Sequence, residues 1–104
     1  MPGFEIRRES DCVVVAPAGD VVSSSASELR PAMRDLVRSG VRELVLDLGH
    51  AEMIDSTGIG LMLSAYNSIS RVGGRFSVVQ ASDEVVELLH TMRVHQHFSV
   101  AGRQ

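Results

Sequence analysis

Cysteine, aromatic residues and clusters of basic residues are all scarce in this sequence. The single cysteine, Cys12, cannot form an internal disulfide. Aromatic residues make up 4% of the chain, so the core must be built from aliphatic side chains. The formal net charge of −3 and the lack of a Lys/Arg cluster argue against a nucleic-acid partner.

Membrane and export signals are missing as well. No apolar run approaches the ~20 residues that span a bilayer, and the first residues lack the basic and apolar segments of a signal peptide. A length of 104 residues with 44% hydrophobic content fits one domain, which we place at 1–104. We therefore expect a cytoplasmic protein without direct membrane insertion.

The most informative stretch is Met53 to Gly60, which reads Met-Ile-Asp-Ser-Thr-Gly-Ile-Gly. The apolar run 43–48 precedes it and is typical of a strand covered on both faces. Behind it, apolar residues recur at helical spacing for about three turns: Ile59, Met62, Leu63, Tyr66 and Ile69. A strand and a loop are thus predicted to deliver Asp55, Ser56 and Thr57 to a helix N-terminus.

Two interpretations of Ser56 follow from that position. Ser, Thr and Asp are preferred helix N-caps, and a cap contributes on the order of 1 kcal/mol. Alternatively, the free N–H groups and the helix dipole favour a phosphate on the serine. Gly58 and Gly60 favour the second interpretation, because each costs about 0.8–1 kcal/mol of helix propensity and glycine usually marks the close approach of another backbone.

The helix that follows has a second face of small, almost uncharged residues. At about 100° per residue these residues share one side: Thr57, Leu61, Ser64, Ala65 and Ser68. A solvated helix face is normally charged. We therefore predict that this face, with Leu61 exposed on it, is covered by a partner.

The remaining elements alternate between strands and helices. Residues 4–7 and 12–16 are predicted to form an opening hairpin within residues 1–19. Ser25 with Glu28 fits a capping box for a first helix that ends near Gly40, and Pro31 is expected to distort its first turn or to delay its start rather than to break it. The second helix covers 57–72, a strand 75–80, and Ser82 caps a third helix. An edge strand is predicted at 98–100, and residues 101–104 are predicted to be frayed. This order indicates an α/β fold: a mixed, mostly parallel sheet of four to five strands packed against three helices.

The sequence gives little evidence for a catalytic site or a metal site. Ser56 does not lie in a Gly-x-Ser-x-Gly nucleophile elbow, and no phosphate loop or dinucleotide fingerprint is present. His95 and His97 would share a face of a short strand, yet two ligands without a third make a weak metal site. Asp47, Glu52 and Asp55 are interpreted as polar strand-end and loop residues. We predict no enzyme activity, no metal and no cofactor.

The run from Leu44 to Gly60, Leu-Val-Leu-Asp-Leu followed by Met-Ile-Asp-Ser-Thr-Gly-Ile-Gly, resembles the signature of the STAS domain, and more narrowly that of bacterial anti-sigma factor antagonists. The resemblance extends from the first strand to Phe98. It implies a STAS-like domain that binds an anti-sigma factor with serine kinase activity and thereby releases a sigma factor.

The resemblance also implies a switch and a site. The kinase phosphorylates the serine that corresponds to Ser56, which ends binding, and a PPM-type serine phosphatase resets it. The antagonist is a monomer when free. The implied partner surface consists of Asp20, Val22, Ser23, Ser24, Asp55, Ser56, Thr57, Gly58, Gly60, Leu61 and Ser64.

Two departures from the family pattern leave an alternative open. The first loop keeps Gly19 and Asp20 but has Val22 where the family usually places an Asp, and Thr57 replaces the commoner second serine. The alternative is a non-switching STAS scaffold, or an accessory subunit of a signalling complex or a membrane transporter. An unassigned enzyme is a third, weaker alternative.

Overall fold

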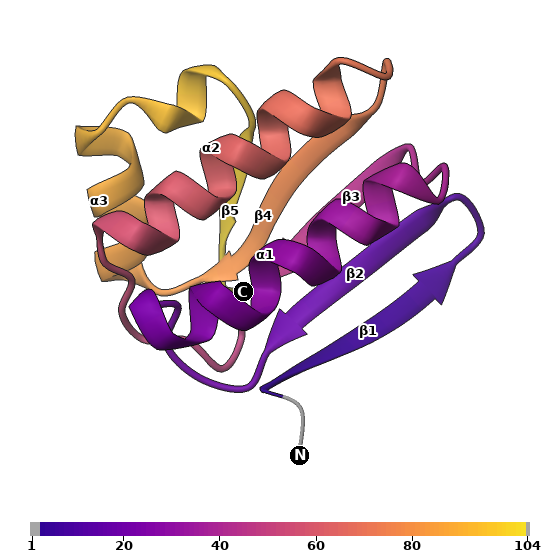
Figure 1. Cartoon of the computed structure of the whole chain (residues 1–104). Coiled ribbons are helices and arrows are strands. Elements are labelled where there is room, and N and C mark those ends of the chain that lie inside the picture. The colour runs from indigo at the N-terminus through magenta and orange to yellow at the C-terminus, as the bar shows by residue number, and fades with distance from the viewer. Residues whose placement is uncertain (1–2, 104) are drawn as a thin grey trace.

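The computed structural model describes residues 3–103, which form one five-stranded sheet with its helices (Figure 1). The elements, in chain order, are β1 (Phe4–Glu9), β2 (Cys12–Pro17), α1 (Ser23–Arg38), β3 (Glu43–Asp47), α2 (Ser56–Ser70), β4 (Arg75–Ala81), α3 (Asp83–Thr91), the short 3₁₀ helix η1 (Val94–Gln96) and β5 (Ser99–Gly102). The predicted α/β class and strand–helix alternation are confirmed.

The strands lie in the sheet in the order in which they occur in the chain, β1-β2-β3-β4-β5. β1 and β2 form the antiparallel hairpin, and the other pairings are parallel. Each crossover advances by one strand in the same direction. Because such crossovers are right-handed, α1, α2 and α3 lie on one face of the sheet, and Figure 1 shows α1 and α2 side by side across it.

This one-sided arrangement corrects the expectation for residues 43–48. Leu44 and Leu46 point toward the helices and are 0% exposed, whereas Val45 points to the opposite face and is only half-buried. The apolar run had suggested cover on both faces. Within residues 3–103 the second face has no helix on it, because every crossover packs on the first.

Two helix starts differ from the predicted ones. α1 begins at Ser23 rather than after Ser25, and the Ser25 hydroxyl accepts a hydrogen bond from the Val22 N–H (2.9 Å), so that Ser25 caps from inside the first turn. α1 also continues through Pro31. α2 begins at Ser56, one residue before the predicted start. The predicted N-cap of α3 is confirmed, since the Ser82 hydroxyl accepts from the Val85 N–H (3.2 Å).

The expectation of a frayed tail at 101–104 is wrong for the residues that the structure describes. β5 extends to Gly102, and the backbone N–H of Arg103 donates to the Ala81 carbonyl (3.2 Å). Gln104 lies outside the described residues. Residues 99–102 thus form the edge strand of the sheet, and Arg103 is hydrogen-bonded to β4.

Candidate functional site

The site is built at the first turn of α2. The Asp55 carboxylate accepts a hydrogen bond from the Gly58 N–H (3.0 Å), so Asp55 is the N-cap. Ser56 is the first residue of the helix, and its side chain is exposed. Because Asp55 already satisfies the capping requirement, the Ser56 hydroxyl is not needed for it and lies at the surface, where the helix dipole favours negative charge.

The loop between β2 and α1 (residues 18–22, the β2–α1 loop) lies beside the loop between β3 and α2 (residues 48–55, the β3–α2 loop). A parallel bridge joins Val21 to Ile54. The Val21 N–H donates to the Met53 carbonyl and the Asp55 N–H donates to the Val21 carbonyl, both at 3.3 Å. The two loops that the family resemblance implies as one surface are therefore neighbours.

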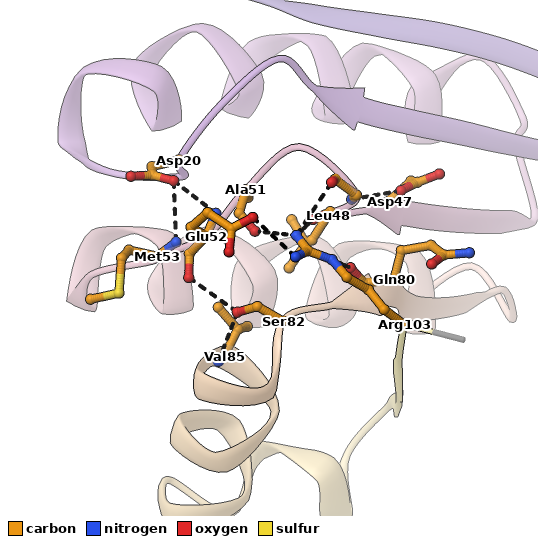
Figure 2. Close-up of polar contacts among 11 residues, drawn as sticks. Asp20, Asp47, Leu48, Ala51, Glu52, Met53, Gln80, Ser82, Val85 and Arg103 are labelled. Carbon is orange, nitrogen blue, oxygen red and sulfur yellow. Dashed lines mark hydrogen bonds and ion pairs between the residues drawn. The ribbon is translucent and has the colours of Figure 1, made fainter.

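Asp20 strengthens this junction. One of its carboxylate oxygens accepts from the backbone N–H groups of Glu52 (2.9 Å) and Met53 (3.1 Å), as Figure 2 shows. That role is structural, because the oxygen satisfies two N–H groups of the neighbouring loop. The carboxylate nevertheless remains at the surface.

The first turn of α1 borders the same region. Ser23 and Ser24 are exposed, and Val22, immediately before the helix, is half-buried. The Ser25 hydroxyl donates to the Asp20 carbonyl (2.7 Å), which holds the loop against the start of the helix. The end of this loop and the first turn of α1 thus present one apolar residue and two hydroxyls.

The two glycines of the motif have different surroundings. A Cβ on Gly58 would lie 2.5 Å from the Val21 carbonyl oxygen, so glycine is required for the β2–α1 loop to cross α2. The close approach inferred from the sequence is therefore made at Gly58 by the chain itself. Gly60 is exposed, and a Cβ there would have nothing within 4 Å.

The face of α2 predicted to be outward is the face that α1 covers. Leu61 is 1% exposed, not exposed as predicted, and Ser64 lines the α1–α2 interface with Met33 and Arg34. Leu61 and Ser64 are thus removed from the partner surface. The residues on both sides of α2 are small or apolar, so the sequence pattern did not distinguish the side that faces α1 from the side that faces solvent.

The surface that remains beside Ser56 includes a residue that the sequence reasoning did not single out. Met53 is 54% exposed, and its carbonyl accepts from the Val21 N–H at the junction of the two loops. Thr57 is half-buried. The exposed positions of α2 continue from Ser56 to Gly60 and Asn67.

The structure does not bring the other candidate groups together. His95 lies in η1 and His97 just after it, not on a strand as predicted; His95 stacks on His90 (ring centroids 4.0 Å apart) and His97 packs against Tyr66. Within residues 3–103 no three His, Cys, Asp or Glu side chains form a metal cluster. None of the helices in that range is long and apolar enough to cross a bilayer.

The carboxylates near the site have structural partners. Asp47 accepts from the Gly49 N–H (2.8 Å) and pairs with Arg7 (3.4 Å), and Glu52 pairs with Arg103 (3.0 Å). These contacts agree with the interpretation of Asp47 and Glu52 as strand-end and loop residues. Arg103 was missed because the tail was expected to be frayed.

Comparisons with known proteins give a matching family model and several similar structures. The sequence model of the STAS domain matches residues 3–102. The anti-sigma F factor antagonist of Paenibacillus polymyxa is 26% identical over 87 residues, which cover 83% of this chain and 74% of the relative. A crystal structure assigned to the anti-sigma factor antagonists, from Thermotoga maritima, has a TM-score of 0.89 at 23% identity and covers 94% of this chain and 85% of its own. The Bacillus cell fate determinant SpoIIAA, in its phosphorylated form, has a TM-score of 0.76 at 17% identity, with 94% and 90% covered.

Proposed function

This chain belongs to the STAS domain family, and we propose that it is an anti-sigma factor antagonist whose binding is switched off by phosphorylation of Ser56. The named relatives support the general role. In this proposal the chain is a binding protein and the substrate of its partner, not an enzyme. The partner is an anti-sigma factor with serine kinase activity, and a PPM-type phosphatase removes the phosphate.

The observation that carries the proposal is that Asp55, and not Ser56, caps α2 and leaves the Ser56 hydroxyl exposed. Asp55 caps α2 through the Gly58 N–H (3.0 Å), while Ser56 is exposed at the first helical position. A kinase must reach the hydroxyl that it modifies, and a hydroxyl used as a buried cap would be withdrawn from it. The Ser56 hydroxyl is accessible to a kinase, and it lies at a helix N-terminus that tolerates the negative charge of a phosphate.

The proposed partner surface is narrower than the set inferred from the sequence. It consists of Asp20, Val22, Ser23, Ser24, Met53, Asp55, Ser56, Thr57 and Gly60. Gly60 contributes through the absence of a side chain, since nothing in the chain occupies the space beside it. Gly58 is not part of this surface, but its lack of a side chain lets the Val21 backbone pack against the first turn of α2.

The proposed switch is electrostatic. A phosphate adds about −1.5 to −2 charge at neutral pH. In the free protein the helix dipole offsets part of that charge, by an effect of about 0.3–1 kcal/mol. In a docked complex the phosphate would be desolvated next to the Asp55 carboxylate. Each ~1.4 kcal/mol of lost binding energy weakens affinity tenfold, so a modest repulsion suffices and the fold need not change.

The experiment that tests this function is affinity capture of the chain from its own cells, with mass analysis of the peptide containing Ser56. We expect an anti-sigma kinase bound to unmodified chain and a separate free pool phosphorylated on Ser56. Unmodified Ser56 in stoichiometric association with transporter or scaffold subunits would contradict the proposal in favour of the non-switching role.

A further inference from the structure

The guanidinium group of Arg103 is the centre of a hydrogen-bond network around the β3–α2 loop (Figure 2). Its Nη2 donates to the carbonyl oxygens of Leu48 (3.0 Å), Gly49 (3.3 Å) and Ala51 (2.7 Å). Its Nη1 donates to the Glu52 carboxylate (3.0 Å). One side chain from the end of the chain thus holds four residues of the loop that leads to Ser56.

The backbone of β4 is shaped to receive the same side chain. The pairing of β4 with β5 shifts register between Val78 and Ala81, and Gln80, within this shift, has a φ of +58°. A non-glycine residue in that region is strained, and the strain is accommodated here by a β-bulge. The Gln80 carbonyl accepts from the Arg103 Nε (3.0 Å), so the bulge directs a carbonyl to the guanidinium.

The carbonyls of the β3–α2 loop need such a donor. Three carbonyl oxygens converge on Nη2, where in the absence of a cation they would repel each other. The Leu48 carbonyl also accepts from the Ala51 N–H (3.1 Å), so the guanidinium matters most for the carbonyls of Gly49 and Ala51. Arginine suits this arrangement because its planar group offers five N–H donors in a fixed geometry. Lysine has the charge but not the planar array.

Other contacts fix the loop immediately after the part that Arg103 holds. Asp20 accepts from the N–H groups of Glu52 and Met53, and the Ser82 hydroxyl donates to the Glu52 carbonyl (3.1 Å). The bridge between Val21 and Ile54 and the Asp55 cap follow directly. The backbone between residues 48 and 55 is therefore held by Arg103, by the β2–α1 loop and by Ser82 at the start of α3.

We propose that Arg103 is a positioning residue for the Ser56 site: it fixes the β3–α2 loop so that Met53 and Ser56 are presented in one arrangement to the partner. This inference rests on the proposed function. It predicts that a substitution at the far end of the sequence alters the site, although Arg103 lies outside the proposed partner surface.

The first arm of the test uses the isolated chain and needs no partner. Amide hydrogen exchange and ¹H–¹⁵N chemical shifts are compared for the wild type, Arg103→Ala and Glu52→Gln. In Arg103→Ala the amides of Glu52 and Met53 should exchange at least ~10-fold faster, and the Ser56 to Gly58 signals should shift, while the amides of Leu44 and Leu46 in the central strand remain protected. Glu52→Gln removes only an exposed ion pair, which contributes little, and should leave the Met53 amide and the Ser56 to Gly58 signals in place.

The second arm measures binding to the anti-sigma kinase that the wild-type chain captures, purified and used as the probe. Arg103→Ala should weaken its affinity by ~10-fold or more, whereas Arg8→Ala, at an exposed arginine of β1, should not. The variants should have similar secondary structure by circular dichroism. The Arg8→Ala control shows that loss of one positive charge is not the cause.

The outcomes separate the two proposals. Unchanged loop amides in Arg103→Ala, or an equal effect in Glu52→Gln, would overturn the positioning role whatever the partner is. Changed loop amides with unaltered kinase affinity would also overturn it. If the wild-type chain captures no kinase, the proposed function fails, and the inference fails with it even where the amides confirm the loop contacts.

Discussion

Gly58 and Gly60 lie two residues apart in the first turn of α2, yet only Gly58 is required by the packing of the chain itself. A side chain at position 58 would meet the Val21 carbonyl oxygen at 2.5 Å, whereas position 60 is open. Gly60→Ala should therefore stabilise the free protein by about 0.5–1 kcal/mol through helix propensity. Gly58→Ala should destabilise it by about 1–3 kcal/mol through overpacking. Urea unfolding of the two variants measures both changes.

The same pair separates folding from binding. If Gly60 is kept small for a partner, Gly60→Ala will bind the anti-sigma kinase more weakly although it is more stable. Equal affinity of Gly60→Ala and wild type would show that position 60 is not in the interface. A stabilising effect of Gly58→Ala would contradict the contact with Val21.

Cys12 provides a test that depends on pH. Burial raises the pKa of its thiol, and the negative charges of Glu43 and Glu9 raise the pKa further. The folded state thus favours the neutral thiol, which contributes stability below the unfolded pKa and loses it as pH rises through the folded pKa. At pH 8 we expect iodoacetamide to alkylate Cys12 more slowly in the folded chain than in the chain unfolded in urea. An equal rate in both states would contradict the shift.

At the scale of elements, the contact between α1 and α2 determines which surface of α2 is free. Leu61 is 1% exposed at this contact. Leu61→Ala should lower the free energy of unfolding by about 2–5 kcal/mol, whereas Asn67→Ala, at an exposed position of the same helix, should change it by less than about 0.5 kcal/mol. Thermal unfolding monitored by circular dichroism measures the difference. A mild effect of Leu61→Ala would favour the prediction from the sequence, in which Leu61 is exposed on a face that a partner covers.

The order of elements could be predicted from local sequence signals. Period-2 and period-3.6 patterns located the strands and helices, and Ser82 with its acidic neighbours marked the start of α3. The pattern did not reveal which side of α2 faces α1, because Leu61, Ser64 and Ala65 are as small or apolar as the opposite side. Nor did it reveal that β3 is covered on one face only, since that depends on the direction of every crossover.

The candidate site was predictable in part for a similar reason. Asp55 and Ser56 carry a helix-start signal that is local in sequence. The hydrogen bonds of Arg103 are not local, because Arg103 is more than fifty positions away from both Leu48 and Glu52 in the sequence. An arginine beside a glycine near the end of the sequence has no signal of its own, and the β4–β5 pairing brings it to the loop.

At the scale of the whole molecule, the site lies where loops following neighbouring parallel strands meet. The β2–α1 and β3–α2 loops both follow the carboxyl ends of their strands, and β5 ends beside them with Arg103. The sheet and the three helices hold these loops from behind. A modification at Ser56 can therefore alter the surface without altering the core.

This arrangement predicts that a negative charge at Ser56 is tolerated by the folded protein. Ser56→Asp should change the free energy of unfolding by no more than about 1 kcal/mol, because the helix N-terminus favours the charge. Differential scanning calorimetry of Ser56→Asp and Ser56→Ala measures this change. A large loss of stability in Ser56→Asp would mean that phosphorylation acts by unfolding the start of α2 rather than by repulsion at an interface.

In the proposed switch, charge at Ser56 controls partner binding. The most direct measurement is the affinity of Ser56→Ala and Ser56→Asp for the captured anti-sigma kinase, determined by isothermal titration calorimetry. We predict that Ser56→Ala binds and that Ser56→Asp binds at least ~10-fold more weakly, which corresponds to about 1.4 kcal/mol. Equal affinities of the two variants would contradict the electrostatic switch.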